Sequence, residues 1–313
     1  MRRAGTAETQ EATRGFVLLN ALVLVAALAA AAAFVLSRAE STRQRQAGAQ
    51  GAVQGGLYLD GFEALALTLL RADQRGGPID GPGDNWARAE YTVDIDRGRI
   101  SGGIQDLQGR FNVNWLANPE DVAALAAFER LLVDLNLRPQ LVGVIVASLR
   151  PGGAAAQQAY ARLQPPVTPV GGPVLMVEQL RQIPGLRPRD YARLAPHLAA
   201  LPSDSQLNVN TASVTVLKSL LPGAKAEGLT QILSNRARQP FGSTEDFLTR
   251  VAPVVGDAGV PELEELRFGI GSAWFHADIA VELDGLILRR QTIFERRPLP
   301  YGPQVAYRLE NRP

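Results

Sequence analysis

Two histidines and several acidic groups are the side chains of this sequence that could do acid–base or metal chemistry. His197 and His276 lie in different predicted units, and neither has a second ligand at a metal-binding spacing. The acidic groups fall in predicted helices with solvated faces: Glu245, Asp246, Glu262, Glu264 and Glu265. The chain has no cysteine and no Gly-x-Ser-x-Gly, P-loop or His-Glu-x-x-His motif. The sequence therefore predicts no catalytic residue, no cofactor-binding residue and no metal ligand.

The stretch from Val216 to Lys225, followed by the apolar run 229–233, is a candidate anion-binding element. It resembles a helix-hairpin-helix, in which backbone N–H groups of a Gly-rich turn contact phosphate. Ala224 stands in the region of the second hairpin glycine, and the formal net charge is only +1, whereas DNA-binding proteins usually carry a basic surplus. We interpret the hairpin as a packing element. A membrane-anchored DNA receptor of the competence type is the alternative.

Residues 16–36 form an apolar segment to which the rest of the chain is attached. At ~1.5 Å per residue, a helix of this length crosses the ~30 Å hydrocarbon core of a bilayer. A signal peptide would be cut near residues 29–33 and would leave a secreted soluble protein. Cleavage after Gly15 would instead keep the segment as a stem. Arg14, Gly15 and Phe16 before an uninterrupted apolar helix resemble the type IV prepilin class, which implies removal of the leader on the cytoplasmic side and methylation of Phe16.

Asn20 is the polar side chain within this apolar segment. Most members of the prepilin class carry a glutamate as the fifth mature residue, which is the place of Asn20, and that carboxylate pairs with the terminal amine of a neighbouring subunit. An amide removes this contact, which a subunit with no subunit above it can dispense with. A polar residue tolerated near the membrane edge explains Asn20 equally well.

Downstream of the stem, apolar residues return at a helical spacing. Tyr58, Phe62, Leu65 and Leu69 share one face of a predicted helix that ends near Arg71. Glycines clustered between residues 48 and 61 favour a break or kink around 48–56, because each glycine costs ~1 kcal/mol in a helix interior.

Alternating apolar residues at both ends of the chain predict β-strands. The predicted strands are 89–95, 100–107, 274–283, 286–296 and 305–310, with turns at Arg97-Gly98 and Asp284-Gly285. Because an isolated hairpin is marginal in water, we expect one sheet, built from both ends and laid against the helix of residues 57–71. The predicted fold class is α+β.

The residues between these strands indicate a helical insertion. Helices are predicted at 119–135, 139–149, 174–182, 188–197, 213–221 and 226–238, with another starting at Ser243, and 151–173 is a Pro-, Gly- and Ala-rich loop. Two similar segments, Phe111 to Asn114 and Leu207 to Asn210, open two halves of the insertion. Their four asparagines are predicted to cap turns rather than to bind a ligand.

In combination, these features resemble the type II secretion system minor pseudopilin K family. The resemblance is carried by the stem without the glutamate, the segments 57–70 and 106–114, the motif 207–212 with its hairpin, and the terminal strands. It implies a pseudopilin fold, in which a long N-terminal helix packs on a small antiparallel sheet, with a large all-helical domain inserted between strands. The expected parts are a leader (1–15), a transmembrane helix (16–36), the pseudopilin helix and sheet (37–110 and 270–313) and two halves of the inserted domain (111–202 and 203–269).

The resemblance also implies a role without enzymatic activity, at the tip of a periplasmic pseudopilus whose assembly the subunit initiates or caps for protein export. The expected partners are minor pseudopilins I, J and H, the prepilin peptidase and the bacterial inner membrane, crossed once with the bulk in the periplasm, and no nucleic acid. Characterised relatives bind calcium through an acidic segment of the helical domain. The matching residues here, 147–177, contain no Asp or Glu, so that site is not carried over.

Overall fold

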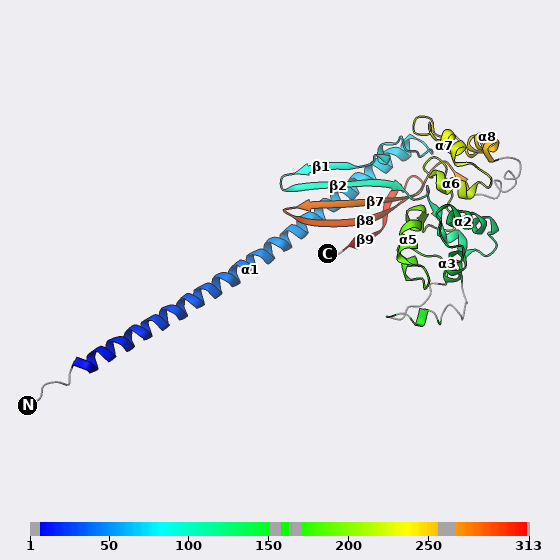
Figure 1. The fold of residues 1–313 in the computed structure, drawn as a ribbon. Helices are drawn as coiled ribbons and strands as arrows, with labels where there is room; N and C mark the ends of the chain where they lie inside the picture. Colours follow the sequence, from blue (N-terminus) through cyan, green and yellow to red (C-terminus); the bar gives the residue numbers. More distant parts are fainter. Residues whose placement is uncertain are drawn as a thin grey trace, which may run out of the picture.

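A long helix, a five-stranded sheet and a block of short helices make up the molecule (Figure 1). The computed structural model describes residues 7–150, 158, 160–162, 164, 171–255 and 267–311. The sheet lies against the C-terminal half of the helix, and the helical block lies beyond the sheet, at the end of the molecule remote from the N-terminus. Most of the predicted loop 151–173 and the acidic group 262–265 lie outside the described residues.

Helix α1 (Ala7–Gly76) runs without interruption through the glycine-rich stretch. The expected break around 48–56 is therefore wrong, and the helix also continues past Arg71. Two of the glycines face the sheet. A Cβ on Gly51 would lie 3.6 Å from Leu286, and one on Gly55 would overlap the Leu288 side chain. These glycines allow the sheet to approach the helix closely, and that packing outweighs the helix propensity that they lack.

Substituting two neighbouring glycines should separate these effects. A Cβ on Gly56 would meet no atom within 4 Å, so Gly56→Ala should raise the free energy of unfolding by about 1 kcal/mol. Gly55→Ala must displace Leu288 and should leave the protein about 1 kcal/mol less stable than Gly56→Ala. Urea denaturation of the two variants in detergent micelles measures the difference. Equal gains would mean that α1 and the sheet do not meet closely at Gly55.

The face of α1 that packs on the sheet is rotated from the predicted one. Its centre is formed by Leu59, Phe62, Ala66 and Leu70, all nearly fully buried, whereas Leu65 is 38% exposed. Only Phe62 of the predicted set belongs to this buried centre. Glu63, also buried, lies on the same side, and a charged residue in that position hides the true face from a hydrophobic pattern.

The sheet contains five antiparallel strands drawn from both ends of the chain. In chain order these are β1 (Tyr91–Ile95), β2 (Gly98–Asp106), β7 (Trp274–Leu283), β8 (Leu286–Arg296) and β9 (Pro303–Asn311). Their spatial order is β1-β2-β7-β8-β9. The prediction of a single sheet built from the two chain ends is confirmed. The turn between β7 and β8 has positive φ angles at Asp284 and Gly285, as an Asp-Gly hairpin requires.

The core between the sheet and α1 is apolar and aromatic. Phe275, Ile279 and Val281 of β7 are fully buried beneath the helix. Trp86, in the short 3-10 helix η1 (Asn85–Ala87), closes one end of this core with its ring 5.0 Å from that of Phe275. This packing fixes the direction in which α1 leaves the body.

The helical block is inserted between β2 and β7. Its first half contains β3 (Phe111–Asn112), η2 (Val113–Ala117), α2 (Val122–Asp134), α3 (Leu141–Leu149), η3 (Val177–Gln182), α5 (Pro188–Leu194), η4 (Ala195–His197) and β4 (Leu198–Ala199). Its second half contains β5 (Leu207–Asn208), α6 (Val214–Leu220), α7 (Ala226–Leu233), α8 (Thr244–Val255) and β6 (Phe268–Gly269).

Two predictions for the block are wrong in detail. The helix expected over 174–182 is a 3-10 helix that begins at Val177, and the helix expected over 226–238 ends at Leu233.

Each half of the block opens and closes with a short strand, and the two strands of a half pair in parallel. β3 pairs with β4 and β5 pairs with β6, so the beginning and the end of each half are held side by side. A single apolar core runs through both halves, with α2 packed on α6. The two halves therefore form one packed unit attached to the end of the sheet.

Candidate assembly stem and domain junction

The first part of α1 carries an apolar surface that the rest of the described chain leaves uncovered. Phe16, Leu24 and Leu36 are 64%, 64% and 70% exposed. An 18-residue window of this helix has a mean hydropathy of 2.5, and none of it is buried. Such a surface is unfavourable in water but stable in a lipid bilayer or against other apolar helices. Residues 16–36, the stem, are therefore suited to a membrane anchor.

The three residues predicted for processing and assembly all lie at the beginning of the stem. Gly15 and Phe16 are within α1, and the Asn20 side chain is exposed like its apolar neighbours. Cleavage after Gly15 would leave a helix that begins at Phe16. That cleavage, the methylation of Phe16 and the assembly role of Asn20 stay predictions.

A cluster of charged side chains, with Glu63 buried at its centre, connects α1 to strands β8 and β9 of the sheet. Glu63 is 3% exposed and accepts hydrogen bonds from Arg308 of β9, at 2.7 and 2.9 Å, and from Thr292 of β8, at 2.6 Å. Arg290 of β8 lies 3.4 Å from Glu63 and 2.6 Å from Asp60. Burial acts to raise the pKa of Glu63, but the hydrogen bonds and charges of the arginines outweigh it, so that the pKa lies below its usual range.

A second buried polar network joins the sheet to the helical block. Asp106, at the end of β2, accepts hydrogen bonds from Asn208 at 3.0 Å, from the Ser272 hydroxyl at 2.6 Å, from the Gln108 backbone at 2.7 Å and from the Thr211 hydroxyl. Burial raises the pKa of Asp106 to about 6, against the lowering effect of these bonds. The Asp106 network ties together both points at which the chain crosses between sheet and block.

Of the four asparagines of the repeated motif, Asn112 and Asn208 cap turns as predicted, whereas the side chains of Asn114 and Asn210 bond distant backbone instead. Asn112 Oδ1 accepts the Asn114 N–H and Asn208 Oδ1 accepts the Asn210 N–H. The second asparagine of each pair then binds a distant backbone segment, since Asn114 bonds both N–H and C=O of Val174, and Asn210 does the same with Phe241. The motif therefore holds each half of the block together.

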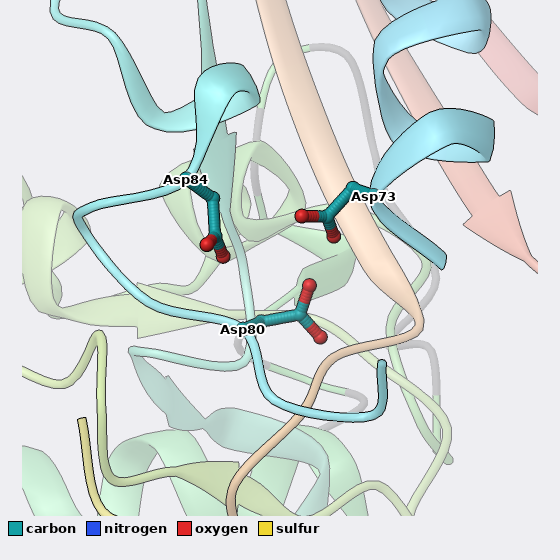
Figure 2. A group of neighbouring side chains, drawn as sticks. All are labelled: Asp73, Asp80 and Asp84. Carbon is teal, nitrogen blue, oxygen red and sulfur yellow. The ribbon is translucent and has the colours of Figure 1, made fainter. Parts of the chain in front are cut away.

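Three aspartates that the sequence pattern does not single out form the group of side chains best able to hold a metal ion in the described part of the chain. Asp73 lies near the end of α1, and Asp80 and Asp84 lie in the loop that follows. Their ligand oxygens are within 4.8 Å of one another, and Figure 2 shows the carboxyl groups facing each other. Burial, with the nearby charges of Asp80 and Asp84, raises the pKa of Asp73 to about 7. Aspartates spaced along a Gly- and Pro-rich loop are the sequence signal that could have drawn attention to this group, the aspartate triad.

The two histidines do not form a common site. His276 lines a cleft beside the face of the sheet that α1 does not cover. His197 lines a second cleft at the edge of the helical block, and Arg110 borders both clefts. For each histidine, burial and the charge of Arg110 lower the pKa, which favours the neutral ring. This arrangement fits packed residues better than an acid–base pair.

The helix-hairpin-helix segment is used in packing within the block. Leu217, Leu220 and Leu229 are buried, and Gly223 makes the turn with a φ of +79°. The Lys218 ammonium lies 2.7 Å from Asp134 of α2. One of the two lysines that could face phosphate is therefore paired with a carboxylate.

Comparison with known proteins places this architecture. Models of the family described as Type II secretion system (T2SS), protein K, match residues 109–203 and 207–257. The Type II secretion system protein K of Pseudomonas aeruginosa is 30% identical over 301 residues, which cover 89% of this chain and 86% of the relative. The chain belongs to the type II secretion system protein K family. The protein K of Aeromonas hydrophila is 25% identical over 90% of this chain and 92% of its own length.

A solved structure of a complex supports the fold of this family member. In the GspK-GspI-GspJ complex from the enterotoxigenic Escherichia coli type 2 secretion system, one chain matches with a TM-score of 0.75 and 19% identity, over 86% of this chain and all of that chain. At that identity the match speaks for the fold alone. It confirms the predicted α+β pseudopilin fold with its long N-terminal helix and antiparallel sheet.

Membership of the protein K family shows the general role of this chain. The chain is a minor pseudopilin of the type II secretion system, a subunit for protein transport, and its apolar stem fits a transmembrane anchor. The family consists of structural subunits rather than enzymes.

Proposed function

We propose that this minor pseudopilin occupies the tip of a periplasmic pseudopilus and initiates or caps its assembly for protein export. Support comes from the position of the helical block at the end of α1 remote from the stem (Figure 1). A block of this width above the stem leaves no room for another subunit to stack on the same axis. The exposed stem remains free to pack against subunits below.

The partners proposed for this chain are minor pseudopilins I, J and H. Support comes from the structural relative, which was solved as a complex with GspI and GspJ, and from the uncovered apolar residues along α1. Asn20 in place of the usual glutamate removes one charged attachment, as suits a subunit with nothing above it. The prepilin peptidase cleaves after Gly15, and the subunit sits in the inner membrane with its bulk in the periplasm. It acts by protein contacts, without enzymatic activity or a nucleic-acid partner.

Disulfide crosslinking can test the contacts directly because the chain contains no cysteine. Single cysteines at Leu22 and Leu28, which are 68% and 63% exposed on the stem, should crosslink in membranes to cysteines scanned along the stems of pseudopilins I and J. The control is Val122→Cys, because Val122 is 69% exposed on α2 in the block. If the block caps the assembly, this position gives no crosslink to another pseudopilin.

Two outcomes would contradict the proposal. Stem cysteines that give no crosslink in an assembling system would remove the packing role. Crosslinks at Val122 as strong as those at the stem would remove the capping role. Duplex DNA binding by the full chain, weakened by added salt, would favour the DNA-receptor alternative instead.

A further inference from the structure

We propose that the aspartate triad, Asp73, Asp80 and Asp84, is a binding site for a hard divalent cation, with Ca²⁺ as the fitting ion. It would join the end of α1 to the loop that leads into the body of the molecule. The site is separate from the 147–177 region in which calcium binding is expected of relatives, and it uses residues outside the helical block. It also goes beyond the proposed tip function, because it can be measured on the isolated subunit.

The three carboxylates are held in place by donors on one oxygen each. Arg296 donates to Asp73 Oδ2 at 2.8 Å and also to Asp80 Oδ2, which accepts the Ser272 N–H at 2.6 Å as well. Asp84 Oδ2 accepts the Gly81 N–H at 2.7 Å. Donors of this kind orient a carboxylate before any ligand arrives, as they do around metal ligands in general.

One oxygen of the triad has no protein partner. Asp80 is 1% exposed, and its Oδ1 accepts no hydrogen bond from the residues that the structure describes. A buried carboxylate oxygen without a donor is costly, by ~1–3 kcal/mol or more for a charged group. Figure 2 shows the Asp80 carboxyl group turned toward Asp73, into the space that the three side chains share. This orphaned oxygen points to a missing positive ligand rather than to a solvated acidic surface.

The charges of the triad are also unbalanced. Arg296 is the cation that contacts it, through Asp73 and Asp80, while Asp84 has no ion pair among the described residues. One guanidinium against three carboxylates leaves an excess of negative charge in a mostly buried place. Either protons or a cation must relieve this excess, and a divalent ion relieves all three groups at once.

The spacing and the donor type select the ion. Oxygen ligands within 4.8 Å of one another can share an ion that takes oxygen at ~2.3–2.6 Å, which is the range of Ca²⁺. Mg²⁺ requires ~2.0–2.1 Å and a near-ideal octahedron, which three residues spread over a loop and a helix end supply less readily. Waters would complete the shell. The bound ion would draw Asp73 of α1 toward Asp80, whose backbone and side chain contact Asn208 and Ser272 of the Asp106 network.

The test is a thermal unfolding series on the full mature chain in detergent micelles, with CaCl2 or EGTA. Calcium at ~10 mM should raise the Tm of the wild type by about 5 °C, because an ion that binds only the folded state stabilises it. Asp73→Asn and Asp84→Asn should abolish the shift. Without calcium these variants should melt at or above the wild-type temperature, since each removes one of the crowded like charges. The matched control is Asp94→Asn on β1, an exposed aspartate paired with Arg99, which should keep the full shift.

Tb³⁺ luminescence provides a second readout that reports position. Trp86 is 2% exposed and lies two residues after Asp84, so excitation of its indole should sensitise bound Tb³⁺. Added Ca²⁺ should quench this signal by competition, and Trp86→Phe should remove most of it. No calcium shift in the wild type, or a shift that persists in both Asp73→Asn and Asp84→Asn, would overturn the proposal.

Discussion

Asp106→Ala is expected to lower the free energy of unfolding of the full chain by about 3–5 kcal/mol, because it leaves several buried polar groups without an acceptor. The carboxylate receives bonds from two hydroxyls, a side-chain amide and a backbone N–H. Water cannot easily replace it, since Asn208 and Ser272 are 0% and 6% exposed. Urea denaturation, followed by the near-ultraviolet signal of the tryptophans, measures the loss.

Two controls give this result its meaning. Asp106→Asn keeps one acceptor oxygen and can pair again with hydroxyls that rotate, so that it should cost clearly less than the alanine variant. Asp278→Ala, on the exposed face of β7, should stay within about 0.5 kcal/mol of the wild type. If Asp106→Ala were as mild as Asp278→Ala, the sheet and the block would not depend on this network for their attachment.

The strands can be predicted almost residue by residue, because their signals are local. Alternating residues on either side of Asp284-Gly285 predict β7 and β8 with the bounds that the structure has. The β1–β2 hairpin is also predicted, but its turn is wrong by one residue, because Gly98 begins β2 and pairs with Ile95, which leaves Asp96 and Arg97 in the turn. Pairing of the two hairpins follows from the weakness of each alone. The stem is equally local, since an uninterrupted apolar run has few alternatives.

The packing of α1 cannot be predicted from its pattern, because tertiary contacts decide it. Gly51 and Gly55 count against a helix by propensity, yet the sheet needs their missing side chains. A charged residue such as Glu63 is evidence against a buried helix face. The structure nevertheless buries it, because strands more than two hundred positions away supply its partners Arg290, Thr292 and Arg308. A hydrophobic pattern contains no information about partners so distant in the sequence.

The contacts that form the junction and the aspartate triad cannot be predicted from sequence patterns for the same reason. The asparagines of the repeated motif are predicted as caps, and the local half of their bonding is as expected. Their long-range bonds, and the meeting of Asp80, Asp106 and Ser272, depend on how an insertion of this size closes on the sheet. Single acidic residues in a loop look solvated until the fold gathers them.

The second large effect is expected at Glu63, where α1 contacts strands β8 and β9. Glu63→Ala should lower the free energy of unfolding by about 3 kcal/mol, because it removes a buried acceptor while the arginines around it stay. Arg290 is 7% exposed and would lose the Glu63 carboxylate that lies 3.4 Å away, and the Thr292 hydroxyl, fully buried, would lose its acceptor. The stem would then be held less firmly, so that limited proteolysis of the body should also become faster.

The pH dependence of this loss distinguishes a charge effect from a simple cavity. Because the folded-state pKa of Glu63 lies below its ordinary value of 4.5, the carboxylate contributes stability that is complete above that value and is lost as the pH falls through the folded-state pKa. The gap between the wild type and Glu63→Gln should therefore be constant near neutral pH and shrink below pH 4.5. Glu40→Gln, the same change on an exposed part of the same helix, should show neither the loss nor the pH trend. A gap between the wild type and Glu63→Gln that stayed unchanged in acid would mean that Glu63 acts through its shape rather than its charge.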